Sequence, residues 1–116
     1  MFDKKKIGNE GEENAVNFLF ANGYEVLERN YRFGRGEVDI IARKDSVMVF
    51  IEVKTRKNIS YGYPETFISE AQEDRIHLAA EEYVLQKGWQ GEVRFDIIAI
   101  LWDGSEPTLD HFEDAF

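Results

Sequence analysis

Two β-branched segments separated by a short polar turn place the firmest constraint on the fold of this chain. Residues 37–43 and 47–55 are rich in Val and Ile, as β-strands are, and residues 44–46 between them are polar. This pattern predicts an antiparallel β-hairpin. The polar turn is centred where it must be if Asp39 and Glu52 face each other across the hairpin.

A helix and a strand are predicted before the hairpin. Apolar residues at helical spacing mark a first helix at residues 10–21, with Asn9 as its N-cap and Gly23 as its stop signal. Residues 24–31 have the composition of a strand, and the glycine-rich segment 34–36 that follows predicts a turn into the hairpin. The hairpin therefore gains a third strand on its N-terminal side.

The second helix carries the clearest end signals in the sequence. Ser69 and Gln72 form a capping box, and Gly88 follows the last turn. The remaining predicted segments are a loop at residues 57–67, an apolar strand at 93–101 and a short edge strand at 109–112. At 116 residues the chain is long enough for one core. The element order predicts a single α/β domain, residues 1–116, with an αβββαβ core and a mixed sheet flanked by helices.

The charges of the chain are distributed unevenly. The net charge of −9 argues at first against a nucleic-acid partner, since phosphate binding relies on Lys and Arg. Residues 29–57, however, hold eight basic and four acidic residues, a local charge of +4, and the remainder carries −13. This basic segment is either a solvated charged surface or a nucleic-acid interface. The candidate nucleic-acid-binding residues are Arg32, Arg35, Arg56 and Lys57.

Asp39, Glu52 and Lys54 form the candidate reactive cluster. Side chains alternate along a strand, so Glu52 and Lys54 share one face, and pairing places the Asp39 and Glu52 Cβ atoms about 4.5–5.5 Å apart. Facing carboxylates repel each other, and Mg²⁺, which prefers two carboxylates with waters and phosphate oxygens, would neutralise them. A bound metal can activate a phosphodiester and water, while a lysine orients the water. The alternative is that Lys54 or Arg56 forms salt bridges with both acids on a solvated sheet face.

The sequence contains no cysteine and no pattern for export or membrane insertion. The missing cysteine excludes a disulfide framework and thiolate metal sites. No signal-peptide pattern follows the basic start, and no segment approaches the ~18 apolar residues of a membrane span. We therefore expect a cytoplasmic protein without a membrane partner.

Three motifs follow one another along the chain: Gly8-x-x-Gly11-Glu12-x-x-Ala15, Gly36-Glu37-Val38-Asp39-Ile40-Ile41 and Phe50-Ile51-Glu52-Val53-Lys54-Thr55-Arg56. Arg94-Phe95-Asp96 comes later, either as a structural ion pair or as part of a site. Over nearly the whole chain these motifs resemble the YraN family of largely uncharacterised bacterial proteins. That family is similar to the PD-(D/E)xK, restriction-endonuclease-like nucleases, which include archaeal Holliday junction resolvases.

The resemblance implies a restriction-endonuclease-like fold and assigns a role to each residue of the candidate cluster. Asp39 and Glu52 would hold Mg²⁺ or Mn²⁺ with help from the Val53 carbonyl, and Lys54 would be the catalytic lysine. Glu12 corresponds to the first-helix acid that can complete the metal shell in related resolvases. In this chain Glu12 could equally cap the first helix. Related resolvases act as dimers, so a homodimer is expected by analogy.

The leading functional hypothesis is a metal-dependent endonuclease that hydrolyses DNA phosphodiester bonds, with DNA favoured over RNA. A preference for branched or flapped DNA rests on family analogy alone. Two alternatives stay open. One is a nucleic-acid-binding module that keeps the nuclease fold with little or no catalysis, and the other is a protein-interaction domain whose acidic body docks a basic partner.

Overall fold

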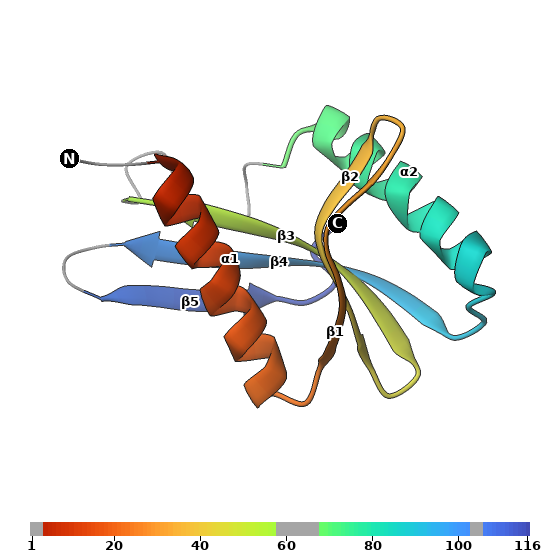
Figure 1. Cartoon of the computed structure of the whole chain (residues 1–116), viewed down its shortest axis with the longest axis horizontal. Helices are drawn as coiled ribbons and strands as arrows, with labels where there is room; N and C mark the ends of the chain where they lie inside the picture. Colours follow the sequence, from red (N-terminus) through yellow and green to blue (C-terminus); the bar gives the residue numbers. More distant parts are fainter. Residues whose placement is uncertain (1–3, 58–67, 103–105) are drawn as a thin grey trace.

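In the computed structural model, a five-stranded sheet lies between two helices, and the three layers form an α/β/α arrangement (Figure 1). The structure describes residues 4–57, 68–102 and 106–116, with side chains described from residue 9. The elements are α1 (Lys4–Ala21), β1 (Glu25–Phe33), β2 (Gly36–Lys44), β3 (Val47–Arg56), α2 (Glu70–Lys87), β4 (Glu92–Trp102) and β5 (Pro107–Phe112).

The sheet is mixed, and its spatial order is β1-β2-β3-β4-β5. Neighbouring strands pair antiparallel except β3 and β4, which run parallel and are joined by the crossover through α2. A parallel pair needs such a crossover because a tight turn can join only antiparallel strands. The predicted αβββαβ core with a mixed sheet and flanking helices is confirmed, and β5 extends it by an edge strand.

The central hairpin has the predicted register. The β2–β3 pairs run from Ile40 opposite Ile51 to Lys44 opposite Val47. The turn is therefore centred in the polar segment 44–46, and Asp45 adopts the left-handed backbone with φ of 54° that such tight turns require. Side chains alternate strictly on β3, so the register decides which of them face each helix.

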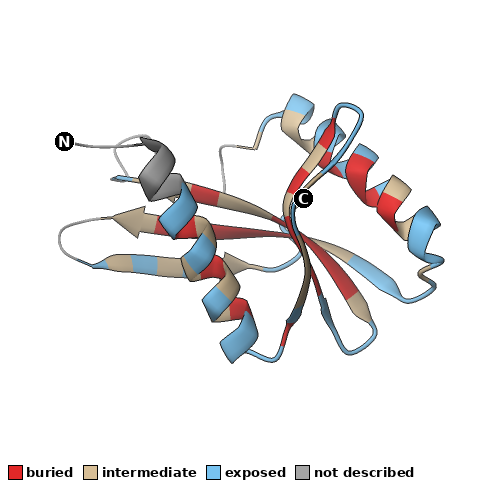
Figure 2. Cartoon of the chain, viewed as in Figure 1, coloured by how far each residue is buried: buried red, intermediate tan, exposed pale blue. Residues whose placement is uncertain are grey.

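Each face of the sheet buries its own apolar cluster. On the α1 face, Ala15 and Leu19 of the helix pack against strand residues that include Val49 and Ile51. On the α2 face, the helix packs against strand residues that include Met48 and Phe50. Figure 2 shows the buried residues along the central strands and on the inner sides of both helices. Glu52 and Lys54 alternate in step with Phe50, so they belong to the α2 face.

Strand β2 leaves the sheet before it ends. Its pairing with β3 stops at Ile40, while its pairing with β1 continues to Gly36, so the β1–β2 hairpin turns away from β3 towards α2 (Figure 1). A Cβ atom at Gly36 would lie 2.7 Å from the backbone nitrogen of Ala79, and only glycine allows this close approach. The divergence of β2 from β3 opens a space beneath the first turns of α2.

Two local predictions for the helices have different outcomes. The prediction that α1 starts at residue 10 with Asn9 as its N-cap is wrong, because the helix already begins at Lys4 and Asn9 lies inside it. Asparagine costs well under about 1 kcal/mol in a helix interior, so it does not end the helix. The capping box of Ser69 and Gln72 is confirmed, as is the left-handed Gly88 after α2. The predicted loop 57–67 lies, from residue 58 onward, outside the described residues.

Within the described parts of the chain, no helix combines the length and the apolar character needed to cross a bilayer.

Candidate active site

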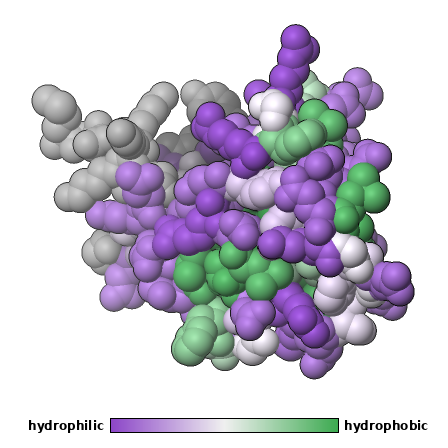
Figure 3. All heavy atoms as spheres, turned by 45° about the vertical axis from the view of Figure 1, so that its right-hand side comes forward, coloured by the Kyte–Doolittle hydropathy of each residue, from purple (hydrophilic) through white to green (hydrophobic). Residues whose placement is uncertain are grey.

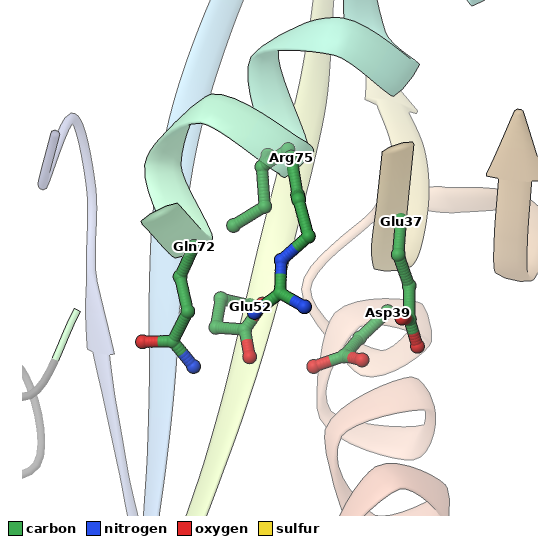
Figure 4. Close-up of a pocket in the computed structure, with 6 residues that line it drawn as sticks. Glu37, Asp39, Glu52, Gln72 and Arg75 are labelled. Carbon is green, nitrogen blue, oxygen red and sulfur yellow. The ribbon is translucent and has the colours of Figure 1, made fainter. Parts of the chain in front are cut away.

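A cavity of about 180 Å³ occupies the space between β2, β3 and the start of α2. Figure 4 shows the polar side chains that point into the cavity from the strands and from the helix. The described residues that line it are Glu37, Asp39, Glu52, Gln72, Arg75 and Ile76.

Asp39 lies where β2 stops pairing with β3. The backbone N–H of Val53 donates a hydrogen bond to Asp39 Oδ2 at 2.8 Å. A side-chain oxygen thus satisfies a β3 backbone donor that the diverging strand β2 no longer reaches. This bond ties Asp39 to β3 beside Glu52, so the two carboxyl groups predicted to meet across the hairpin do share one cavity.

The electrostatic environment of Asp39 favours its protonated form. Burial, and after it the negative charge of Glu52, raise the pKa of Asp39 to about 8 against an opposing effect of the Val53 hydrogen bond. The charges of Glu12 and Glu37 raise it further. Within the described chain, Asp39 forms no ion pair with Lys or Arg. The alternative in which one basic side chain bridges both acids is therefore not what the structure shows.

Glu52 and Lys54 form a largely buried ion pair next to Asp39. Lys54 Nζ lies 3.6 Å from Glu52 Oε1, and their side chains are only 7% and 17% exposed. Burial raises the pKa of Glu52, and the positive charge of Lys54 opposes that rise. Lys54 therefore compensates one of the two carboxylates, and its ammonium group stays close to the cavity because both residues are on the same face of β3.

Glu12 binds residues of β1 rather than the two strand carboxylates. Asn30 Nδ2 donates to Glu12 Oε1 at 2.8 Å, and Arg29 Nε lies 3.5 Å from the same oxygen. Because α1 begins at Lys4, Glu12 sits in the helix interior, so the prediction that it could cap the helix is wrong. Its charge still reaches Asp39, whose pKa it raises.

The donor set suits a hard divalent cation that is bound by few protein ligands. Among the described residues, no three Asp, Glu or His side chains are arranged to hold a metal by themselves. Asp39 and Glu52 offer two carboxylates in one polar cavity. Mg²⁺ is usually bound by one or two carboxylates, with waters and substrate phosphates completing the octahedron. The residues present therefore fit Mg²⁺ or Mn²⁺ better than a metal that needs a closed cage.

The four basic residues predicted to bind nucleic acid occupy two separate places. Arg32 and Arg35 lie at the tip of the β1–β2 hairpin, where Arg32 Nη2 is 3.4 Å from Glu37 Oε1. Arg56 and Lys57 lie at the end of β3, where Arg56 Nη1 donates to the Thr55 carbonyl at 3.0 Å. At about 3.3 Å per residue, Arg56 lies roughly 13 Å along β3 from Glu52. Arg32 is nearer, because it pairs with Glu37, two residues before Asp39. None of the four is among the described residues that line the cavity, although Arg32 contacts one of these, Glu37.

The sequence prediction overlooked Arg75, and for Gln72 it favoured a capping role over a contact with substrate. The apolar stripe of α2 contains Ile76 and Ala79, and four residues before each come Gln72 and Arg75. Residues four apart share one helix face, so the face that packs on the sheet continues into the cavity. Extending the stripe by one turn would have found both residues from the sequence.

A second buried carboxylate, Asp96, serves the fold. Arg94 donates to it twice at 2.9 Å, the backbone N–H of Asp114 donates at 3.0 Å, and His111 Nε2 lies 2.7 Å away. Burial acts to raise the pKa of Asp96, but these partners together lower it. The Arg94–Asp96 pair thus ties the C-terminal tail and β5 to β4, in agreement with the structural alternative.

An apolar hollow of about 380 Å³ between α2 and β4 contrasts with the cavity. Figure 3, which brings the α2 side forward, shows hydrophobic side chains gathered in a patch among hydrophilic ones. Val84, Val93 and Phe95 line the hollow, with His77 and Glu81 among its few polar residues. Its described lining residues include no pair of carboxylates and no lysine. The hollow therefore lacks the side chains that the cavity at Asp39 offers to a metal ion.

Comparisons with known proteins give a consistent result. The model of the uncharacterised protein family UPF0102 matches residues 11–100. A UPF0102 protein of Flavobacterium psychrophilum is 41% identical over 100% of this chain and 98% of its own length. A UPF0102 protein of Geotalea daltonii is 44% identical over 98% of this chain and 91% of its own length. One of Dictyoglomus turgidum is 46% identical over 85% of each chain.

Proposed function

The chain belongs to the UPF0102 family, also known as YraN, and we propose that it is a metal-dependent endonuclease that hydrolyses DNA phosphodiester bonds. Asp39 and Glu52 are the proposed metal ligands, helped by the Val53 carbonyl, and Lys54 is the proposed catalytic lysine. Mg²⁺ or Mn²⁺ is the proposed cofactor. Branched or flapped DNA is the proposed substrate, and the proposed location is the cytoplasm. A homodimer stays a prediction by analogy with related resolvases.

One observation carries this proposal: Asp39 and Glu52 approach each other in a polar cavity, and no cation of the described residues neutralises Asp39. Lys54 offsets only the charge of Glu52, so ionising Asp39 beside it destabilises the fold. Such an arrangement is favourable once a divalent cation binds, and perturbed carboxyl pKa values of this kind are typical of functional sites.

Each residue of the proposed site has its own role. Asp39 and Glu52 supply the oxygen ligands, and Val53 fixes the orientation of Asp39 through its N–H. When bound, the metal would polarise the phosphodiester and lower the pKa of a water molecule. Lys54 orients the attacking water and stabilises negative charge, since its ammonium group is held near the carboxylates at 7% exposure. Arg29 and Asn30 both contact Oε1 of Glu12, so Glu12 could join the ligands through its other oxygen, Oε2.

Metal-dependent stabilisation tests the proposal. At pH 8 and at a Mn²⁺ concentration tenfold above its Kd, binding stabilises the folded protein by about 1.4 kcal/mol. For a domain of this size we expect the Tm of the wild type to rise by about 4–6 °C. Asp39→Asn should abolish the rise, because an amide is a poor ligand for a hard cation. Differential scanning fluorimetry with and without MnCl₂ measures both values.

The control for this experiment is Asp110→Asn, an exposed carboxyl group on the edge strand β5, which should keep the full Mn²⁺ response. A wild-type Tm that does not respond to Mn²⁺ at pH 8 contradicts the proposed metal site. So does an equal rise in Asp39→Asn and in the wild type, because the metal would then bind elsewhere.

A further inference from the structure

The helix wall of the cavity carries a cation that has no partner in the described chain. Arg75 lies in the second turn of α2 and points towards the strand carboxylates (Figure 4). It forms no ion pair or hydrogen bond with any residue that the structure describes, although Glu37, Asp39 and Glu52 line the same cavity. Arg75 therefore does not serve as the counter-ion of the carboxyl pair.

Gln72 adds donors on the same wall. Its Oε1 accepts the backbone N–H of Ser69 at 3.0 Å, and its own N–H donates to Ser69 Oγ at 3.1 Å. This capping box fixes the Gln72 side chain by its oxygen alone, which leaves the two Nε2 hydrogens available at the cavity. Together with the guanidinium group of Arg75, the helix wall presents only hydrogen-bond donors, while the strand wall presents carboxylates.

We propose that Arg75 and Gln72 bind a backbone phosphate of the DNA substrate, an inference that rests on the proposed nuclease function. The carboxylates of Asp39 and Glu52 repel a phosphate, so positive charge around the phosphate favours its approach. The metal would supply that charge on the strand wall, and Arg75 supplies it on the helix wall. A guanidinium group suits this task, because its planar fork can bind two phosphate oxygens at once.

The lining also restricts what is recognised. Among the described residues that line the cavity, Ile76 is the one apolar side chain, and the others are polar or charged. Phosphate contacts position a nucleic acid without reading its sequence. Contacts from Arg75 and Gln72 to a phosphate would therefore hold the DNA backbone without reading its bases.

Two substitutions test the subsite without disturbing the helix. Arg75→Ala removes the charge, and Gln72→Glu keeps the capping oxygen while replacing the Nε2 donors with an anionic oxygen. We expect each to raise the Kd for a labelled DNA duplex at least about tenfold, measured by fluorescence anisotropy in Ca²⁺. Arg75→Ala should also lower the salt dependence of log Kd by about 0.9, the loss of one phosphate contact. Arg75→Lys should restore part of the affinity.

Lys87→Ala is the matched control, because it removes one positive charge from the far end of α2, about 18 Å away along the helix. It should leave the Kd unchanged, and the Mn²⁺-induced rise in Tm should persist in all these variants. If the wild type binds DNA and Arg75→Ala keeps the same Kd and salt dependence, the subsite is disproved while the nuclease proposal stands. If the wild type binds neither DNA nor Mn²⁺, both proposals fall.

Discussion

Replacing Glu52 with Gln is expected to lower kcat/KM for Mn²⁺-dependent DNA cleavage at least about 1000-fold, equivalent to ~4 kcal/mol of transition-state stabilisation. The substitution keeps the shape of the side chain but removes one of the two negative charges proposed to hold the metal. It also leaves the ammonium group of Lys54 without the carboxylate 3.6 Å away. Both changes act on the same centre. Steady-state cleavage of a labelled branched DNA substrate measures the loss.

The matched control is Glu25→Gln, which removes an exposed carboxylate from the start of β1 and should cleave like the wild type. Circular dichroism would verify that both variants are folded. If Glu52→Gln keeps more than a tenth of the wild-type kcat/KM, Glu52 does not hold the catalytic metal. If the wild type binds DNA with salt sensitivity but cleaves none of it in Mg²⁺ or Mn²⁺, the protein is a binding module with a nuclease fold.

Asp39→Asn is expected to stabilise the metal-free protein at pH 8, by on the order of 5 kcal/mol. Each pKa unit between the folded and unfolded states corresponds to about 1.4 kcal/mol. Burial and the neighbouring Glu52 raise the folded-state pKa of Asp39 to about 8 from 3.8. Ionisation of this group therefore favours the unfolded chain at pH 8. Asparagine removes that cost, and its side-chain oxygen can still accept the Val53 N–H.

The pH dependence of stability identifies the cause. Between pH ~4 and ~8 the folded protein binds a proton at Asp39 that the unfolded chain has released, so wild-type stability should fall as the pH rises through this window. The fall should be shallower in Asp39→Asn, where only Glu52 of the pair still titrates. Urea unfolding with EDTA at pH 5, 6.5 and 8 gives both curves, and Asp110→Asn should follow the wild type. Parallel curves for the wild type and Asp39→Asn would refute the claim that the raised pKa of Asp39 makes the stability fall with pH.

The parts of the fold that depend on local patterns could be predicted from the sequence. The polar segment 44–46 between two β-branched strands determines the register of the hairpin, and Asp39 and Glu52 meet as that register requires. Ser69 and Gln72 mark the start of α2 because a capping box uses only local contacts. A register and a helix start are decided by residues a few positions apart, so the sequence expresses them directly.

The features that could not be predicted from the sequence depend on how the helices and strands pack. The alternation of residues on β2 does not show that it leaves β3 after Ile40, because the close contact of Gly36 with Ala79 is tertiary. The same divergence brings Arg75 to the cavity. The partners of Glu12, Arg29 and Asn30, lie on β1. Helical spacing in the sequence cannot predict such contacts between two elements.

The measurement that tests the central claim most directly is anomalous diffraction from crystals soaked in MnCl₂ at pH 8. We predict one strong peak at the manganese absorption edge, in bonding contact with carboxylate oxygens of both Asp39 and Glu52, and no peak there in Asp39→Asn. A wild-type crystal without such a peak at millimolar Mn²⁺ would contradict the account. So would one in which Lys54 or Arg75 fills the position between the two carboxyl groups.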